Sequence, residues 1–387
     1  MMKRSVCSVI LAASLGVSAV NPYIDRVLEF CPAPGQFVNE VPWWEDGWNA
    51  GDILAEAQLN IAGTASDPMP GMISLGSFGG YVVFAFDHPV VNVEGEYDFK
   101  IFGNAIRSDR NGDGGSGEPG IVMVSVDANG NGIADDAWYE LAGSEYNAAT
   151  TRHNYRITYY RPEEGKAATP DPDNSAITDA TYIRWTSNDP EAPSGYVKKN
   201  SAHRQSYWPE WNDDEEMTFE GTCLADNAYD RNGEVVLKFL PWGYADNRPN
   251  AEDSGFKLDW AVDSDGNPVH LTHADFFKVY TAINAEHGRL GETSTEISGG
   301  QDLHPEAEMS SVDGIQAVGG SFMILASGNG ALSLHAGTQC KVSVYSVSGF
   351  LVKDFDLMPG RNDIDVSGIS QGIYIVTDGA KSVKIVI

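Results

Sequence analysis

Residues 120–143, GIVMVSVDANGNGIADDAWYELAG, hold the pattern that decides the fold. The run 121–126 is apolar and rich in β-branched residues, which is typical of a buried strand. A loop dense in Asp, Asn and Gly follows it, and residues 137–141 return to strand character. The stretch therefore predicts two strands joined by a polar loop.

The loop has the spacing of a calcium-binding loop. Short oxygen side chains at alternate positions supply three of the six to eight oxygens that calcium needs. The candidate ligands are Asp127, Asn129, Asn131, the carbonyl of Ile133, Asp135 and Asp136. Trp138 stands where an EF-hand has its bidentate Glu, so we predict a calcium loop between strands rather than an EF-hand. The alternative is a hairpin turn whose side chains bond their own backbone.

Two further turns have a similar composition. Asp109, Asn111 and Asp113 repeat the alternate spacing and are followed by Glu118. They could form a second calcium site or share an ion with the first loop, and the alternative is an ordinary flexible turn. Residues 263–268, DSDGNP, offer few ligand positions before the proline, so we interpret them as a tight hairpin.

The N-terminus predicts export. Residues 1–19 combine Lys3 and Arg4, an apolar run at 6–17 and small residues at 17–19, as a cleaved signal peptide does. No other stretch approaches the ~20 consecutive apolar residues of a membrane-spanning helix, so we expect no transmembrane segment. Three cysteines remain beyond this region, which allows at most one disulfide, with Cys31 and Cys223 as the candidate pair.

Composition and charge narrow the class of protein. The chain of 387 residues suggests two or three domains, and its many aromatic residues and glycines between short β-rich runs favour an all-β architecture. The formal net charge is −30. A field of this sign repels phosphate backbones, so we do not expect a nucleic-acid partner, while divalent cations would be attracted.

Aromatic residues beside turns and charges form a candidate ligand site. Aromatic faces next to Asn and Asp suit the CH faces and hydroxyls of a sugar. The candidate ligand-binding residues are Tyr207, Trp208, Trp211, Trp242, Tyr244, Asp246 and Asn247. The alternative is that the aromatic residues pack in the core, but at least some of the group should be exposed.

No catalytic constellation has a specific spacing. The chain has no nucleophile elbow, no His-Glu-x-x-His motif and no phosphate loop. Glu140 or Asp259 could serve a glycosidase as one of its two carboxylates. With 55 acidic residues in the chain, such pairs have little specificity, and binding is the favoured interpretation over catalysis.

The segments 71–86, 86–105 (FDHPVVNVEGEYDFKIFGNA) and 118–143 occur in an order that resembles a family of secreted bacterial cell-surface proteins. The resemblance resumes at 242–247, 256–263, 275–281 and 291–297 and covers about residues 25–305. It implies a jelly-roll-like β-sandwich related to galactose-binding and discoidin-like modules. It also implies that residues 145–240 include an insertion between core strands.

The C-terminal part predicts a separate domain. A polar linker at 306–320 precedes seven short apolar runs in residues 321–387, which predict a small seven-stranded Ig-like β-sandwich. Residues 344–349 (VYSVSG), 357–360 (LMPG), 372–376 (GIYIV) and 384–387 (KIVI) resemble the C-terminal sorting domain of the type IX secretion system of Bacteroidetes. The resemblance implies the type IX secretion machinery as a partner.

The sequence as a whole predicts an all-β protein with a signal peptide at 1–19, a large jelly-roll-like β-sandwich with insertions at 20–305, a linker and the small sandwich. We expect a secreted or outer-membrane cell-surface protein that is stabilised by calcium and binds an extracellular glycan or another small ligand. The alternatives are a polysaccharide-active enzyme and a surface accessory protein for nutrient capture, including corrinoids.

Overall fold

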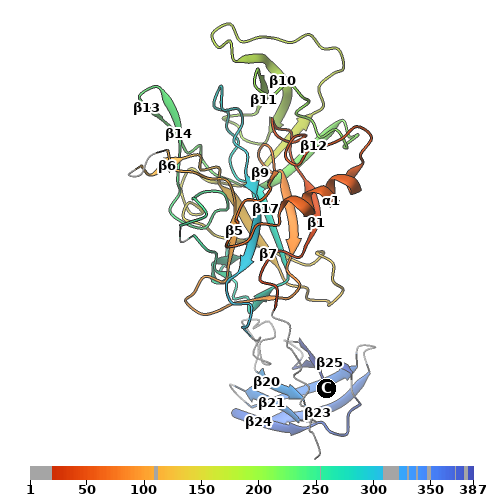
Figure 1. Cartoon of the computed structure of the whole chain (residues 1–387). Coiled ribbons are helices and arrows are strands. Elements are labelled where there is room, and N and C mark those ends of the chain that lie inside the picture. Colours follow the sequence, from red (N-terminus) through yellow and green to blue (C-terminus); the bar gives the residue numbers. More distant parts are fainter. Residues whose placement is uncertain are drawn as a thin grey trace, which may run out of the picture.

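The computed structural model describes residues 20–108, 112–252, 254–307, 322–328, 331–336, 339–346, 350–370, 372–378 and 382–387. The expected signal peptide, Asp109, Asn111 and most of the expected linker lie outside these residues. The expectation of an all-β fold is confirmed, because antiparallel sheets make up nearly all of the regular structure (Figure 1).

A six-stranded antiparallel sheet is the centre of the larger part. Its strands, in spatial order, are β1 (Arg26–Cys31), β3 (Tyr81–Ala85), β17 (Phe276–Thr281), β7 (Gly120–Ser125), β8 (Trp138–Leu141) and β15 (Ala261–Val262). β7 is the apolar run that the sequence predicts to be a buried strand, and β8 is its hairpin partner. Both predicted strands are therefore confirmed.

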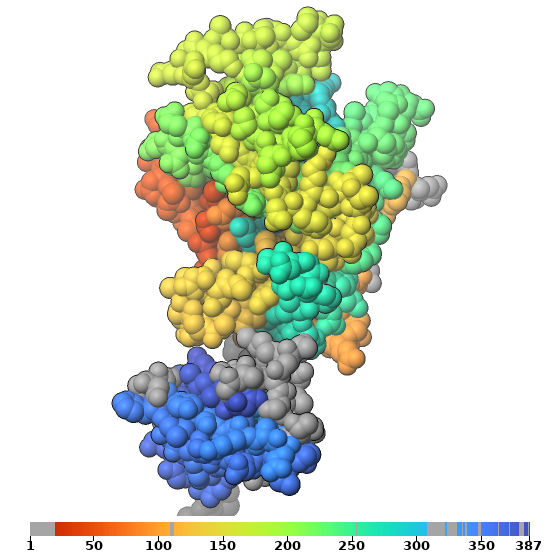
Figure 2. Space-filling view, turned by 180° about the vertical axis from the view of Figure 1, so that it is seen from behind, coloured from red at the N-terminus to blue at the C-terminus, as the bar shows by residue number. Residues whose placement is uncertain are grey.

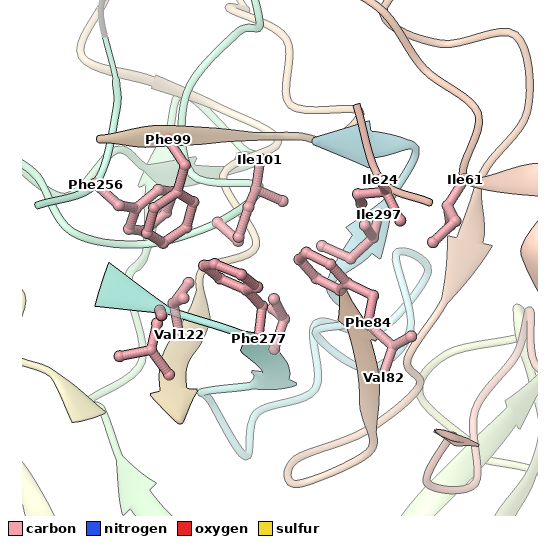
Figure 3. Close-up of a cluster of buried hydrophobic side chains, with 14 of the residues drawn as sticks. Ile24, Ile61, Val82, Phe84, Phe99, Ile101, Val122, Phe256, Phe277 and Ile297 are labelled. Atoms are coloured by element: carbon pink, nitrogen blue, oxygen red, sulfur yellow. The ribbon is translucent and has the colours of Figure 1, made fainter. Parts of the chain in front are cut away.

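Short strand pairs cover one face of this sheet. They are β2 (Ile73–Ser74) with β18 (Glu296–Ile297), β5 (Phe99–Phe102) with β19 (Gly299–Asp302), and β4 (Val90–Val91) with β16 (His273–Ala274). The core between the two layers combines phenylalanine rings with Ile and Val side chains (Figure 3). Phe277 stacks on Phe84 with ring centroids 5.6 Å apart and meets Phe99 edge to face at 4.9 Å. These two layers form the larger β-sandwich.

The expected insertion forms a sheet that covers the other face. Its strands are β9 (Arg152–Tyr160), β10 (Ile177–Ser187), β11 (Ser194–Asn200) and β12 (Glu216–Cys223), in the spatial order β11-β10-β9-β12. Tyr155, Ile157 and Tyr159 of this sheet share a second core with Ile121 and Tyr280 of the central sheet. The central sheet is therefore buried on both faces, which explains the nearly continuous apolar run in β7.

Smaller elements complete the larger part. The strands β13 (Ala228–Arg231), β14 (Glu234–Lys238) and β6 (Gly114–Gly115) form a three-stranded sheet. The helix α1 (Ala50–Asn60) begins with a capping box between Asn49 and Asp52 and buries Ile53 and Ala57, and a 3-10 turn, η1, spans Leu258–Trp260. Cys31 and Cys223 are not joined, so the possible disulfide between them is not present. Each thiol instead packs in the second core.

The C-terminal residues form a small sandwich of seven strands, as the sequence predicts. One sheet has the order β20 (Phe322–Gly328), β21 (Ala331–Ala336), β24 (Gly360–Asp365). The other has the order β23 (Leu351–Leu357), β22 (Cys340–Ser346), β25 (Ile373–Thr377), β26 (Ser382–Val386). Alternate residues such as Val342 and Val344 are fully buried in a core of its own, which a period-2 pattern predicts.

Candidate functional site

A cavity of about 550 Å³ lies where the central sheet, the inserted sheet and the 263–266 turn meet. β8 contributes Trp138 and Glu140, and β12 contributes Thr222. The gold segment near 130 and the teal segment near 260, which leads into the 263–266 turn, lie side by side on the face shown in Figure 2, with the yellow 150s above them. The cavity therefore combines residues that are far apart in the sequence.

The walls of the cavity are aromatic and polar. Trp138 and Tyr146 are partly exposed, and the ring of Tyr146 lies 4.6 Å from that of His153. The turn 263–266 is the tight hairpin that the sequence predicts, closed by the Asp263 N–H donating to the Asn267 carbonyl at 2.9 Å. Gly266 has φ +79°, and a Cβ there would lie 3.1 Å from the Tyr146 hydroxyl, so the turn approaches this wall closely.

Glu140 lies at the back of the cavity and is its most unusual group. Its Oε2 accepts a hydrogen bond from the Thr222 hydroxyl at 2.6 Å, and the same hydroxyl oxygen lies 3.3 Å from His153 Nδ1. Burial raises the pKa of Glu140 to about 7, although the Thr222 hydrogen bond acts in the opposite direction. Near neutral pH Glu140 can therefore be protonated and donate a hydrogen bond to a bound hydroxyl, or be ionised and accept one from it.

The aromatic residues predicted to bind a ligand do not form one surface. Tyr207, Trp208 and Tyr244 are buried, so the expectation that they contact a ligand is not supported by their placement. Trp211 is partly buried and stacks near Phe30 in the core. Trp242 alone of this group is well exposed, at 41%, and its ring lies 4.6 Å from that of Trp260.

Asp246 and Asn247 are buried as well and serve the local backbone. The side chain of Asn247 accepts from the Leu240 N–H at 2.7 Å and donates to the Leu240 carbonyl at 2.8 Å, which closes the intervening turn. The Oδ1 of Asp246 accepts the N–H groups of Asn104 and Ala105. Neither side chain is available to a ligand at the surface.

The predicted calcium loop is exposed and tied by its own side chains. Asp127 accepts the N–H groups of Asn131 and Gly132, and Asp136 accepts that of Ala128. The carboxylate of Asp135 accepts from the side-chain amides of Asn129 and Asn131. Asp113 of the second predicted site is exposed and lies 3.8 Å from a nitrogen of Arg248. The oxygens of the first loop therefore make the side-chain-to-backbone contacts of a turn, which the sequence left open as the alternative.

Sequence reasoning missed one group of carboxylates. Oxygens of Glu118, Asp246 and Glu296 all lie within 4.8 Å of one another. The three residues lie in separate segments with no common motif, so the sequence pointed to Asp246 as a candidate ligand-binding residue but not to the group. The cavity around Glu140 was equally hidden, since its walls come from distant strands and loops.

Comparisons with known proteins leave the chain without an assigned family. No protein-family model matches the chain. No curated protein matches it either. Among the described residues, no helix is both long and apolar enough to span a bilayer.

Proposed function

We propose that the protein is an exported binding protein that holds an extracellular glycan in the cavity beside Glu140. The observation that carries this proposal is the combination of two aromatic faces, Trp138 and Tyr146, with the hydrogen-bonding groups Glu140 and Asn147 in one cavity. Sugars present both CH faces and hydroxyls, and small-ligand sites pair apolar walls with a few placed polar groups. The net charge of −30 favours a neutral or cationic glycan over an anionic one.

Calcium belongs to the same proposal. The loop at 127–136 leads directly into β8, whose first residue is the cavity residue Trp138. A calcium ion held by the Asp and Asn side chains of this loop would restrict the loop and with it the start of β8. The ion is thus proposed to stabilise the position of the aromatic wall.

If the glycan binds in the cavity, substitution of an aromatic residue in the cavity wall should weaken glycan binding. On a glycan array, the full chain should bind one class of neutral glycan, and Trp138→Ala should weaken the affinity for it about tenfold or more, because a central aromatic contact is lost. Trp242→Ala is the matched control, since this exposed tryptophan does not line the cavity. Equal weakening in both variants, or no glycan binding by the full chain, would contradict the proposal.

A polysaccharide-active enzyme is the second candidate. The observation that favours it is the partly buried Glu140, whose pKa near 7 suits a general acid, together with other carboxylates in the same cavity. The two candidates differ in turnover. Release of reducing ends from the bound glycan, abolished by Glu140→Gln, would establish the enzyme, and binding without release would support the binding protein.

We further propose that residues 321–387 are a type IX sorting domain and that the protein reaches the cell surface or medium. The support is the seven-stranded sandwich with its own core, formed by the segments that carry the resemblance. A chain ending at residue 310 should keep the tryptophan fluorescence of the folded larger part, since all nine tryptophans lie between residues 43 and 260. Cell fractionation should find it in the periplasm, and its normal delivery to the surface would refute the assignment.

A further inference from the structure

Three carboxylates from distant segments converge inside the larger part, away from the cavity. Glu118 lies two residues before the start of β7, Asp246 lies in a turn, and Glu296 begins β18. The Glu118 N–H donates to the Asp246 carbonyl at 3.0 Å, and the Glu296 N–H donates to Asp246 Oδ2 at 3.0 Å. Backbone hydrogen bonds therefore fix the three residues relative to one another, and their side-chain oxygens lie within 4.8 Å of each other.

These carboxylates have no cationic partner among the described residues. Asp246 and Glu296 are 3% and 4% exposed, whereas Glu118 is only partly buried. No ion pair in the described part of the chain includes any of them. Burial and the neighbouring carboxylates raise the pKa of Glu118 and Asp246 well above the ordinary range, and burial raises that of Glu296 to about 7. Buried charges are normally paired with an opposite charge or bound to a metal ion.

A fourth carboxylate provides a separate observation. Glu292 is 5% exposed, and its Oε2 has no hydrogen-bond partner among the described residues. Glu292 lies four residues before Glu296, and its other oxygen, Oε1, accepts the N–H of Gln36 at 2.6 Å. Ser294, which lies between Glu292 and Glu296, donates its hydroxyl to Glu296 Oε1 at 2.8 Å and its N–H to Glu118 Oε1 at 3.1 Å. The charge of Glu292 is close enough to act on both Glu118 and Glu296.

We propose that Glu118, Asp246 and Glu296 bind a calcium ion, with Glu292 adding its negative charge beside the ion. Calcium takes oxygen ligands at about 2.3–2.6 Å, so two oxygens on one ion lie up to about 5 Å apart, which matches the spacing of this group. The group contains no His or Cys, the ligands that zinc and other transition metals prefer. The ion joins the start of β7 to β18 and therefore links the central sheet to the strand pairs that cover it.

The test separates this site from the loop at 127–136. The full chain is stripped with EDTA, and binding of calcium alone is measured by titration calorimetry and by metal analysis. The double variant Asp127→Asn/Asp135→Asn disables the loop. It should retain one tightly bound calcium and a calcium-dependent rise in melting temperature. Adding Glu118→Gln should lower the affinity of the remaining ion at least a hundredfold. Glutamine can still accept the Ser294 N–H at the position of Glu118 Oε1.

A second readout distinguishes a metal site from an ordinary buried network. In EDTA, Glu118→Gln should melt at the same temperature as the unsubstituted chain or higher, because one of several repelling charges is removed. In calcium its melting temperature should be the lower of the two. The proposal is overturned if the loop variant binds no calcium, if Glu118→Gln binds calcium as tightly as its parent, or if magnesium alone binds. If Glu118→Gln does not fold, the ion count of the loop variant still decides the question.

Discussion

Replacing Trp208 with alanine is expected to lower the free energy of unfolding of the larger part by about 3–5 kcal/mol, as truncation of a buried tryptophan does. The side chain is 3% exposed, and its Nε1 donates to the Asn212 carbonyl at 3.3 Å. The guanidinium of Arg161 covers the ring at 5.7 Å from its centroid. Truncation would leave a cavity in the second core and remove one of the two donors to the Asn212 carbonyl, the other being Arg161.

The matched control is Trp242→Ala, because its side chain is 41% exposed and much of its surface is already in water. Chemical denaturation followed by tryptophan fluorescence measures both variants, and eight tryptophans remain in each. The control should change the free energy of unfolding by less than about 1 kcal/mol. Equal stability of the two variants would show that Trp208 is not a core residue.

Replacing Glu140 with glutamine is expected to remove a pH-dependent loss of stability. The pKa of Glu140 is raised from 4.5 in the unfolded chain to about 7 in the folded one. The folded state therefore binds the proton more tightly, and this group's contribution to stability is largest below pH 4.5 and declines as the pH rises to about 7. A difference of this size corresponds to about 3 kcal/mol, because one pKa unit is worth about 1.4 kcal/mol.

The measurement is the free energy of unfolding of both proteins from pH 4 to pH 8. The difference between Glu140→Gln and the unsubstituted chain should grow in favour of the variant across the interval from pH 4.5 to 7 and then stay constant. Thr222→Val removes the hydrogen-bond donor that favours the ionised form of Glu140. The pKa of Glu140 should therefore rise further, and its contribution to the free energy of unfolding should decline up to a higher pH. Parallel pH profiles for all three proteins would contradict the assignment.

The local sequence pattern was sufficient to predict strands wherever apolar residues formed a continuous run or alternated with polar ones. The apolar run at 121–126 predicted β7, and the alternation of Val342 and Val344 predicted a strand with one buried face. Turn chemistry was equally readable, since the hairpin at 263–266 follows from its Asp and Gly residues. The helix α1 was missed, although Asn49 and Asp52 form a capping box and the buried residues Ile53 and Ala57 have the i, i+4 spacing of a helical face.

The local sequence pattern did not predict side-chain exposure where residues from distant segments of the chain cover the side chain. Trp208 stands among polar neighbours in sequence, yet Arg161 and Asn39 from other segments cover it and bond to it. The aromatic wall of the cavity forms for the same reason, because Trp138 and Tyr146 meet the 263–266 turn only after β8 pairs with β15. Exposure of a side chain is a property of the packed layers, which no window of neighbouring residues contains.

The sequence by itself determined the β class, most of the strands and the existence of a small C-terminal sandwich, because strand periodicity and turn residues are local properties. Only the tertiary structure decided which acidic residues act together. Glu118, Asp246 and Glu296 belong to ordinary stretches of the chain and meet only after sheet pairing aligns their segments. The repulsion among their charges arises from that alignment and from the exclusion of water, and both are consequences of packing.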